Sequence, residues 1–229
     1  MNCLYGDDLY WKSKDLNPVT FKDAPSHAPL VLAKDGKSGY YIAIMDVKAK
    51  QPAIFLQTLF KQATGVDLER REMYKQKKGE PAGTFETLPV TGEAIVIGDC
   101  PEARALGINP ETMPIEGFEI KTAPERIYIV GRFEGPLANG MEWGVYEFVE
   151  RFLDVRWYFP QAIPDGPEFG RDVPSNPNLQ MPAVWIEDHP RFRMRTIYPP
   201  VSNTWQGKGI NLNAIQKWNR HGNSWPNEL

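Results

Sequence analysis

The 229-residue chain has little cysteine and histidine, which excludes several kinds of site. Cys3 and Cys100 are its only cysteines, so it can form at most one disulfide and no four-cysteine zinc site. The histidines, His27, His189 and His221, lie far apart and form no H-E-x-x-H pair. We therefore expect no metal ion and no other cofactor. Without a histidine nearby in sequence, Cys100 is interpreted as a buried apolar residue and not as a reactive thiol.

The chain also lacks a long apolar run and an excess of basic charge. No stretch reaches the about 18 apolar residues of a membrane span, and the first thirty residues contain no apolar signal core. The formal net charge is -3 and the isoelectric point is near 5.7. Such a chain has no broad basic field, so we expect no nucleic-acid partner and no membrane span.

Motifs for nucleotide or acyl chemistry are missing as well. The segment 131–135 (GRFEG) lacks the lysine and the glycine spacing of a phosphate-binding loop, and no G-x-S-x-G elbow is present. Glycoside hydrolysis needs two carboxyl groups held about 5–9.5 Å apart. The adjacent acids at 7–8 and at 187–188 would point to opposite sides of an extended chain, so we interpret them as solvated surface residues. The sequence therefore offers no catalytic residue.

The apolar residues that are present predict a mixed set of helices and strands. Hydrophobic residues make up 41% of the chain, enough for a core. Leu56, Leu59, Phe60 and Ala63 repeat with helical spacing before Gly65, a residue suited to ending a helix. A second apolar stripe runs from residue 141 to 152, with acidic residues and an arginine on its other face. The pattern predicts strands over 40–45 and 94–98, a hairpin of 117–122 with 126–131, and helices over 52–64, 101–106 and 141–152.

The remaining segments suggest how the chain is divided. We expect an N-terminal extension over 1–30, an α/β module over 31–160 with a solvated loop or hairpin tip within 69–89, and a proline-rich connector over 161–184. Residues 185–229 hold four of the seven tryptophans and six Lys/Arg against three Asp/Glu. Their one convincing strand spans 192–198. Because so little regular structure cannot bury its own core, we interpret this tail as the opening of another domain.

One long motif carries a family resemblance. Residues 143–150 (WGVYEFVE), followed by 155–158 (VRWY) and Pro160, resemble the YGVYEFLE…GVRWYAP pattern of large bacterial glycosidases. Those proteins begin with a module similar to the α-glucuronidase N-terminal domain and to domain 2 of β-hexosaminidases. The order of predicted elements agrees from about residue 30 to the end. One departure is Asp154, where the family commonly has glycine, and aspartate tolerates a left-handed helix end less well.

The resemblance implies both a fold and a function. The fold is an α+β module, a mainly antiparallel sheet with two helices on one face, followed by the incomplete start of a (β/α)8-type barrel. The implied function is that of an accessory domain that supports the catalytic barrel of a glycoside hydrolase acting on polysaccharide-derived, uronate-containing sugars. Its partner is then the downstream catalytic domain of the same exported, periplasmic or extracellular protein. The catalytic carboxylates are expected beyond Leu229, so this chain alone is expected to be inactive.

Substrate-binding residues are implied only near the predicted barrel start. Arg195 matches the arginine of a P-x-F-x-x-R segment that binds sugar hydroxyls in these glycosidases, and its guanidinium suits vicinal hydroxyls or a uronate carboxylate. An equal alternative is that Arg193 and Arg195 alternate along a half-exposed strand. Asn203 and Trp205 follow at the expected lip, where an amide can fix a hydroxyl and an indole can stack on a sugar, or the indole can belong to a core. A stand-alone carbohydrate-binding or protein-interaction module with a tryptophan-rich contact surface is the competing hypothesis.

Overall fold

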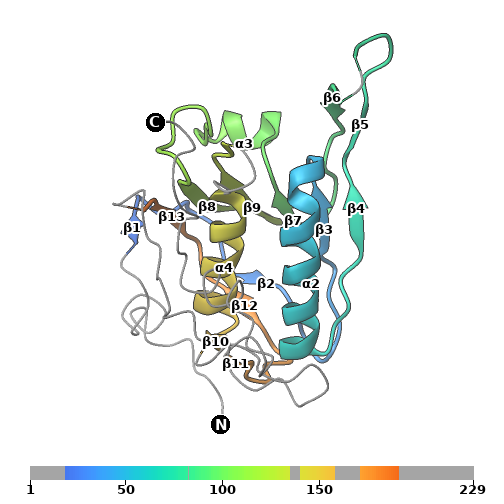
Figure 1. Cartoon of the computed structure of the whole chain (residues 1–229). Helices are drawn as coiled ribbons and strands as arrows, with labels where there is room; N and C mark the ends of the chain where they lie inside the picture. The colour runs from blue at the N-terminus through green and yellow to red at the C-terminus, as the bar shows by residue number, and fades with distance from the viewer. Residues whose placement is uncertain (1–18, 82, 135–139, 158–170, 191–229) are drawn as a thin grey trace, which may run out of the picture.

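The centre of the molecule is a seven-stranded sheet. The computed structural model describes residues 19–81, 83–134, 140–157 and 171–190. The strand order is β1-β13-β8-β9-β7-β3-β4 (Figure 1). The strands are β1 (Thr20–Phe21), β3 (Tyr41–Ile44), β4 (Arg70–Glu72), β7 (Ala94–Ile97), β8 (Phe118–Ala123), β9 (Arg126–Gly131) and β13 (Trp185–Asp188). β9, β7, β3 and β4 run parallel to one another, and β8, β13 and β1 continue the sheet with antiparallel pairings.

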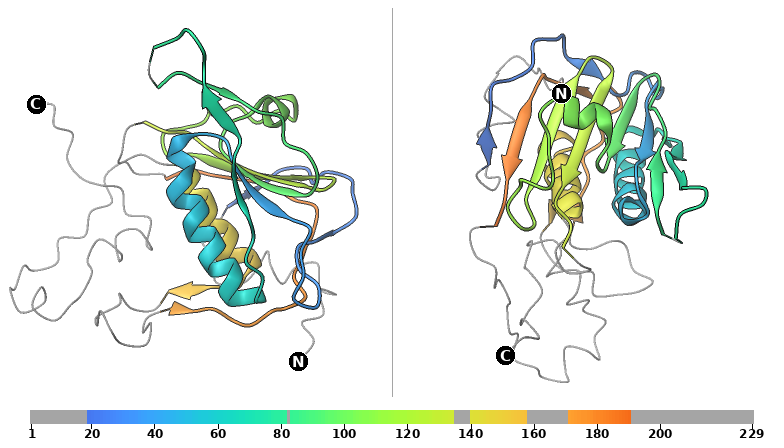
Figure 2. Two further views of the ribbon diagram at one scale, coloured as in Figure 1. Left: turned by 90° about the vertical axis from the view of Figure 1, so that its right-hand side faces the viewer. Right: turned by 90° about the horizontal axis from the view of Figure 1, so that it is seen from above.

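Helices cover both faces of this sheet unequally. The 3-10 helix η1 (Val47–Ala49) continues into α2 (Lys50–Thr64), which lies beside α4 (Gly140–Phe152) on one face, and the short α3 (Pro101–Ala105) lies on the other (Figure 2). The seven-stranded sheet has three parallel and three antiparallel pairings, so it is mixed where the expectation was mainly antiparallel. Three two-stranded antiparallel sheets complete the described parts. The predicted α+β class with two helices on one face is confirmed. None of the described helices is long and apolar enough to cross a bilayer.

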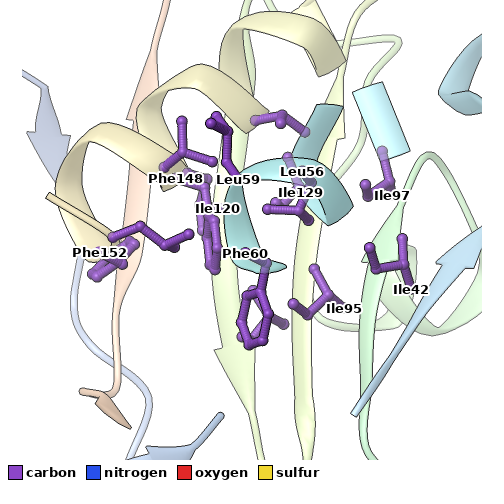
Figure 3. Close-up of a cluster of buried hydrophobic side chains, with 14 of the residues drawn as sticks. Ile42, Leu56, Leu59, Phe60, Ile95, Ile97, Ile120, Ile129, Phe148 and Phe152 are labelled. Atoms are coloured by element: carbon purple, nitrogen blue, oxygen red, sulfur yellow. The ribbon is translucent and has the colours of Figure 1, made fainter. Parts of the chain in front are cut away.

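The main core fills the space between the sheet and the two long helices (Figure 3). Alternate strand residues point to this side, because successive side chains of a strand face opposite ways. The helices contribute the apolar stripes that the sequence predicts. The labelled core residues are Ile42, Ile95, Ile97, Ile120 and Ile129 from the strands, Leu56, Leu59 and Phe60 from α2, and Phe148 and Phe152 from α4.

A second, smaller core lies under α3 on the opposite face. Cys100 belongs to it and is 2% exposed. Its Sγ accepts a hydrogen bond from the backbone N–H of Ala103, 3.4 Å away, at the start of α3. Burial raises the pKa of the Cys100 thiol to about 12, so the thiol stays protonated at neutral pH. The interpretation of Cys100 as a buried residue of the core is confirmed.

The charged stretch after α2 forms an exposed arm. β4 is the edge strand of the main sheet, and the hairpin of β5 (Tyr74–Gln76) and β6 (Phe85–Thr87) extends away from the body (Figure 1). Most of its side chains are exposed, and Lys75 pairs with Glu86 across the hairpin, Nζ to Oε1, at 3.1 Å. The predicted solvated hairpin tip is confirmed. Charged side chains along an exposed edge also discourage pairing with other chains.

The structure describes residues 171–184 of the predicted proline-rich connector, and these residues do not form a separate linker. β11 (Arg171–Asp172) pairs with β10 (Arg156–Trp157), and β12 (Gln180–Met181) pairs with β2 (Leu30–Val31). β13 then joins the main sheet between β1 and β8. Leu179, Met181 and Val184 are at most 1% exposed. Proline is tolerated at the edges of sheets, so the short extended pieces between the prolines can still bury single apolar residues there. The described part of the predicted connector therefore packs onto the module, and the main sheet extends to Asp188 in β13. The predicted strand 192–198 lies outside the described residues.

Candidate functional site

Residues 143–150, which resemble a glycosidase pattern, lie on α4 and place the candidate site there. The other predicted site residues, Arg195, Asn203 and Trp205, lie outside the described residues. Within the described ranges no group of histidine, cysteine and acidic side chains is arranged to hold a metal ion. The candidate site is therefore on α4, and we use the name α4 surface for the aromatic and charged side chains of the motif together with Arg151 and Trp157. Its members are Trp143, Tyr146, Glu147, Glu150, Arg151 and Trp157.

The glycine of the motif sets how closely α4 lies on the sheet. A Cβ at Gly144 would be 2.8 Å from Cγ2 of Ile129 and 3.3 Å from a ring carbon of Phe118. Glycine at this position lets the helix backbone approach β8 and β9 with no side chain between them. The backbone of α4 therefore lies directly against β8 and β9 at Gly144.

Aromatic side chains join the two long helices and the chain after α4. The Tyr146 ring meets the Phe55 ring of α2 edge-on at 4.8 Å, and Phe55 stacks on Trp157 at 5.8 Å. Trp143 lies 5.8 Å from Tyr146 between ring centroids. Edge-to-face and offset pairs of this kind each contribute about 0.5–1.5 kcal/mol beyond area burial. The aromatic residues of the motif therefore fix α4 against α2 and against β10.

Charged residues of α4 are buried, which the amphipathic pattern does not indicate. Arg151 donates through its guanidinium to the Glu147 carboxylate one helical turn earlier. Their side chains are 2% and 0% exposed. Glu150, 8% exposed, accepts a hydrogen bond from Nε1 of Trp157 at 2.7 Å. Charges at these positions of a helix on a sheet are usually solvated, because burying a charge is costly unless it is paired.

The end of α4 is formed by the second half of the motif. Asp154 has φ 58°, in the left-handed region where glycine is favoured. The backbone N–H of Val155 then donates to the carbonyl of Val149, at 3.2 Å. Arg156 donates from Nη1 to the carbonyl of Glu150 at 2.8 Å, which places a cation at the negative end of the helix dipole. The left-handed conformation expected at this helix end is present with aspartate in place of glycine.

This arrangement is suited to packing and not to catalysis. Its carboxylates hold an arginine and an indole in fixed positions, and Nε1 of the buried Trp143 has no hydrogen-bond partner among the described residues. The sequence located the motif but missed the burial of Glu147 and Arg151. Their i,i+4 spacing was a visible signal for an ion pair, yet spacing alone does not distinguish a solvated pair from a buried one.

The phenol of Tyr146 should make stability sensitive to alkaline pH. Burial raises the pKa of Tyr146 well above 10, and the Glu142 carboxylate, which accepts its O–H at 3.1 Å, adds to the shift. The unfolded chain ionises first as the pH passes 10, so the stabilisation present below that pH is lost above it. At one pH unit above 10 we expect a loss of about 1.4 kcal/mol from this group. Urea unfolding at neutral pH and at this alkaline pH should show a loss that is larger by this amount in the natural chain than in Tyr146→Phe, which keeps the other buried groups of raised pKa, Cys100, Tyr40 and Tyr128. An equal pH dependence of the two proteins would contradict it.

Similarity to known proteins is confined to solved structures. No family model matches the chain, and no curated protein matches it significantly. Among solved structures, it is similar to the GH20 β-N-acetylhexosaminidase of Streptomyces coelicolor A3(2), with 18% identity over 78% of this chain and a TM-score of 0.45. It is also similar to the N-acetyl-β-hexosaminidase of Streptomyces plicatus, at 18% identity over 78% of this chain with a TM-score of 0.42. The GH20 exo-β-N-acetylglucosaminidase of Vibrio harveyi shows 16% identity over 78% of this chain and a TM-score of 0.41. The chain spans 26%, 26% and 19% of the lengths of these enzymes.

Proposed function

We propose that this chain is a non-catalytic accessory domain of a glycoside hydrolase, and that it supports a separate catalytic domain. The observation that carries the proposal is the state of the motif's carboxylates on α4: Glu147 is held by Arg151 and Glu150 by the Trp157 indole, and both carboxylates are buried within the chain itself. Buried carboxylates that are engaged in this way hold a helix in place and are not presented to a substrate. The helix that carries the glycosidase-like motif therefore supports the framework of the module.

The finer parts of the proposal concern substrate and location. By resemblance, Arg195 would bind a sugar hydroxyl or a uronate carboxylate, Asn203 would hold a hydroxyl and Trp205 would stack on a sugar ring. The α-glucuronidase-like character of the module, substrates that contain uronate, and export from the cytoplasm all belong to the same proposal. Its catalytic carboxylates would be supplied by the catalytic domain and not by the α4 surface.

An activity assay of the purified chain tests the accessory role. We expect no turnover above background on a panel of neutral and uronate-bearing aryl glycosides, because the α4 carboxylates are engaged in fixed pairs and not placed about a scissile bond. Glu150→Gln serves as the matched variant, since it removes the charge of an α4 carboxylate while keeping an acceptor for the Trp157 indole. Turnover that co-purifies with the natural chain and disappears in Glu150→Gln would overturn the proposal.

A further inference from the structure

A charged cleft of about 490 Å³ lies at the carboxyl ends of three parallel strands. Asp46 follows β3, Asp99 follows β7 and Arg132 follows β9, and all three line the cleft. The chain leaves β3 and β9 towards the face that carries α2 and α4, but leaves β7 towards the face that carries α3 (Figure 2). Where the connections from neighbouring parallel strands go to opposite faces of a sheet, a crevice forms between them, and open α/β sheets bind ligands in such crevices. The volume lies within the roughly 300–1,000 Å³ of small-molecule sites.

The charges that line the cleft largely cancel. Arg104 donates to both carboxylate oxygens of Asp99, from Nε at 3.0 and 2.9 Å and from Nη2 at 2.6 Å, and to Glu111 from Nη2 at 2.8 Å. Arg132 pairs with Glu134 and donates from Nη1 to a backbone carbonyl at 2.7 Å. The full charged lining has four carboxylates and three cations: Asp46, Asp99, Glu111, Glu134, Lys48, Arg104 and Arg132. Apart from Asp46 and Lys48, these charged groups are engaged in ion pairs, which a free anion or a metal ion would have to displace in order to bind them.

The same lining offers many hydrogen bonds next to apolar surface. Asp46 uses Oδ1 to accept from the backbone N–H groups of Lys48 and Ala49, at 2.6 and 3.2 Å. Its second carboxylate oxygen accepts no hydrogen bond within the described ranges, so an acceptor remains for a ligand hydroxyl. Lys48 lies over the Phe133 ring, with Nζ 4.2 Å from the centroid. Phe133, with Pro110 and Met141, adds apolar surface to the lining.

We propose that this cleft binds a neutral saccharide of one or two sugar units. A sugar presents vicinal hydroxyls, which donate to carboxylates and accept from guanidinium and ammonium groups, and its C–H faces pack on apolar side chains. It needs no net charge from the protein, which matches the balanced lining. This site goes beyond the accessory role, since its polar residues are not those of the α4 surface.

Titration of the full 229-residue chain with small sugars tests the site. Amide spectra would be recorded with N-acetylglucosamine, cellobiose and xylobiose as probes, with glucuronate as an anion and glycine as a zwitterion. We expect saturable shifts with the neutral sugars, centred on residues that follow β3, β7 and β9. Binding of a neutral ligand should also be insensitive to added salt, whereas anion binding weakens with it.

Two cleft variants and one control separate this site from general surface effects. Glu111, with a side chain 72% exposed, and Phe133 can be changed without opening the cores. Glu111→Gln should weaken sugar binding about tenfold, as expected for the loss of one charged hydrogen bond to the sugar. Phe133→Ala should weaken it by a similar factor, because it removes apolar surface on which the sugar packs. Glu86→Gln on the β5–β6 hairpin removes a similarly paired, exposed glutamate and should change nothing. The proposal is overturned if the sugars give no saturable shifts, if the cleft variants bind as the natural chain does, or if only glucuronate or glycine binds.

Discussion

Replacing Glu147 by alanine is expected to lower the free energy of unfolding by about 3–5 kcal/mol, because it removes the carboxylate that faces the buried Arg151 guanidinium. The loss comes mainly from taking this acceptor away from a buried guanidinium and not from the ion pair itself, whose attraction is largely offset by desolvation. Urea unfolding followed by tryptophan fluorescence measures it. A loss below about 1 kcal/mol, the range of exposed pairs, would show that the pair is solvated in the folded protein.

A double variant distinguishes the cost of a buried charge from the cost of lost packing. Glu147→Met with Arg151→Leu removes both charges and keeps apolar volume, so it should recover most of the stability that Glu147→Ala loses. The Lys75–Glu86 pair provides the matched control, since both side chains are about half exposed and Glu86→Ala should cost no more than about 1 kcal/mol. If the double variant is as unstable as Glu147→Ala, the charges are not what destabilises the single variant.

Gly140→Ala should destabilise the fold by about 3 kcal/mol or more, although alanine is the better helix former by about 1 kcal/mol. Three backbone segments meet at this residue: the Gly140 N–H donates to the Arg132 carbonyl at 2.9 Å, and the Arg132 N–H donates to the Gly117 carbonyl at 2.8 Å. A Cβ on Gly140 would overlap the Gly117 oxygen. A Cβ on Gly131, which precedes Arg132, would overlap the backbone of Gly140. None of the three main-chain segments can move without separating the start of α4 from the end of β9.

The control for this prediction is a glycine that is needed for a different reason. Gly79, at the tip of the β5–β6 hairpin, has φ 84°, and a Cβ added there would have no neighbouring atom within 4 Å. Gly79→Ala should therefore cost only the about 1–2 kcal/mol of a left-handed alanine. Thermal unfolding of both variants should show the larger decrease in Tm for Gly140→Ala. Equal decreases in Tm for the two variants would mean that the backbone segments around Gly140 can move apart to accept a Cβ without loss of stability.

The elements that the sequence predicted correctly are those determined by local patterns. Helix α2 follows from the spacing of Leu56, Leu59, Phe60 and Ala63, and it ends at Gly65 with φ 79°. The continuous apolar runs of β3 and β7 indicated buried strands, and both are buried along their whole length. Each signal depends on residues a few positions apart, so no knowledge of the partner strand is needed.

Features built by distant residues did not follow from such patterns. The change in composition at residue 185 assigns β13 to a different domain from β8, yet Ile186 pairs with Ile120 in one sheet. The carboxylates of the cleft come from three strand ends and a loop, between residues 46 and 134. Pairing of remote strands depends on the whole chain and leaves no local period in the sequence.

The amino-acid sequence by itself determined the helices α2, α3 and α4, the strands β3, β7, β8 and β9 and the place of the motif on one helix, because side-chain spacing and helix-ending residues act locally. Only the tertiary structure decided that Glu147 and Arg151 are buried, that β13 belongs to the main sheet and that Asp46, Asp99 and Arg132 share a cleft. Burial and proximity are properties of packed surfaces, and the same residue spacing is compatible with a solvated helix face or an enclosed one.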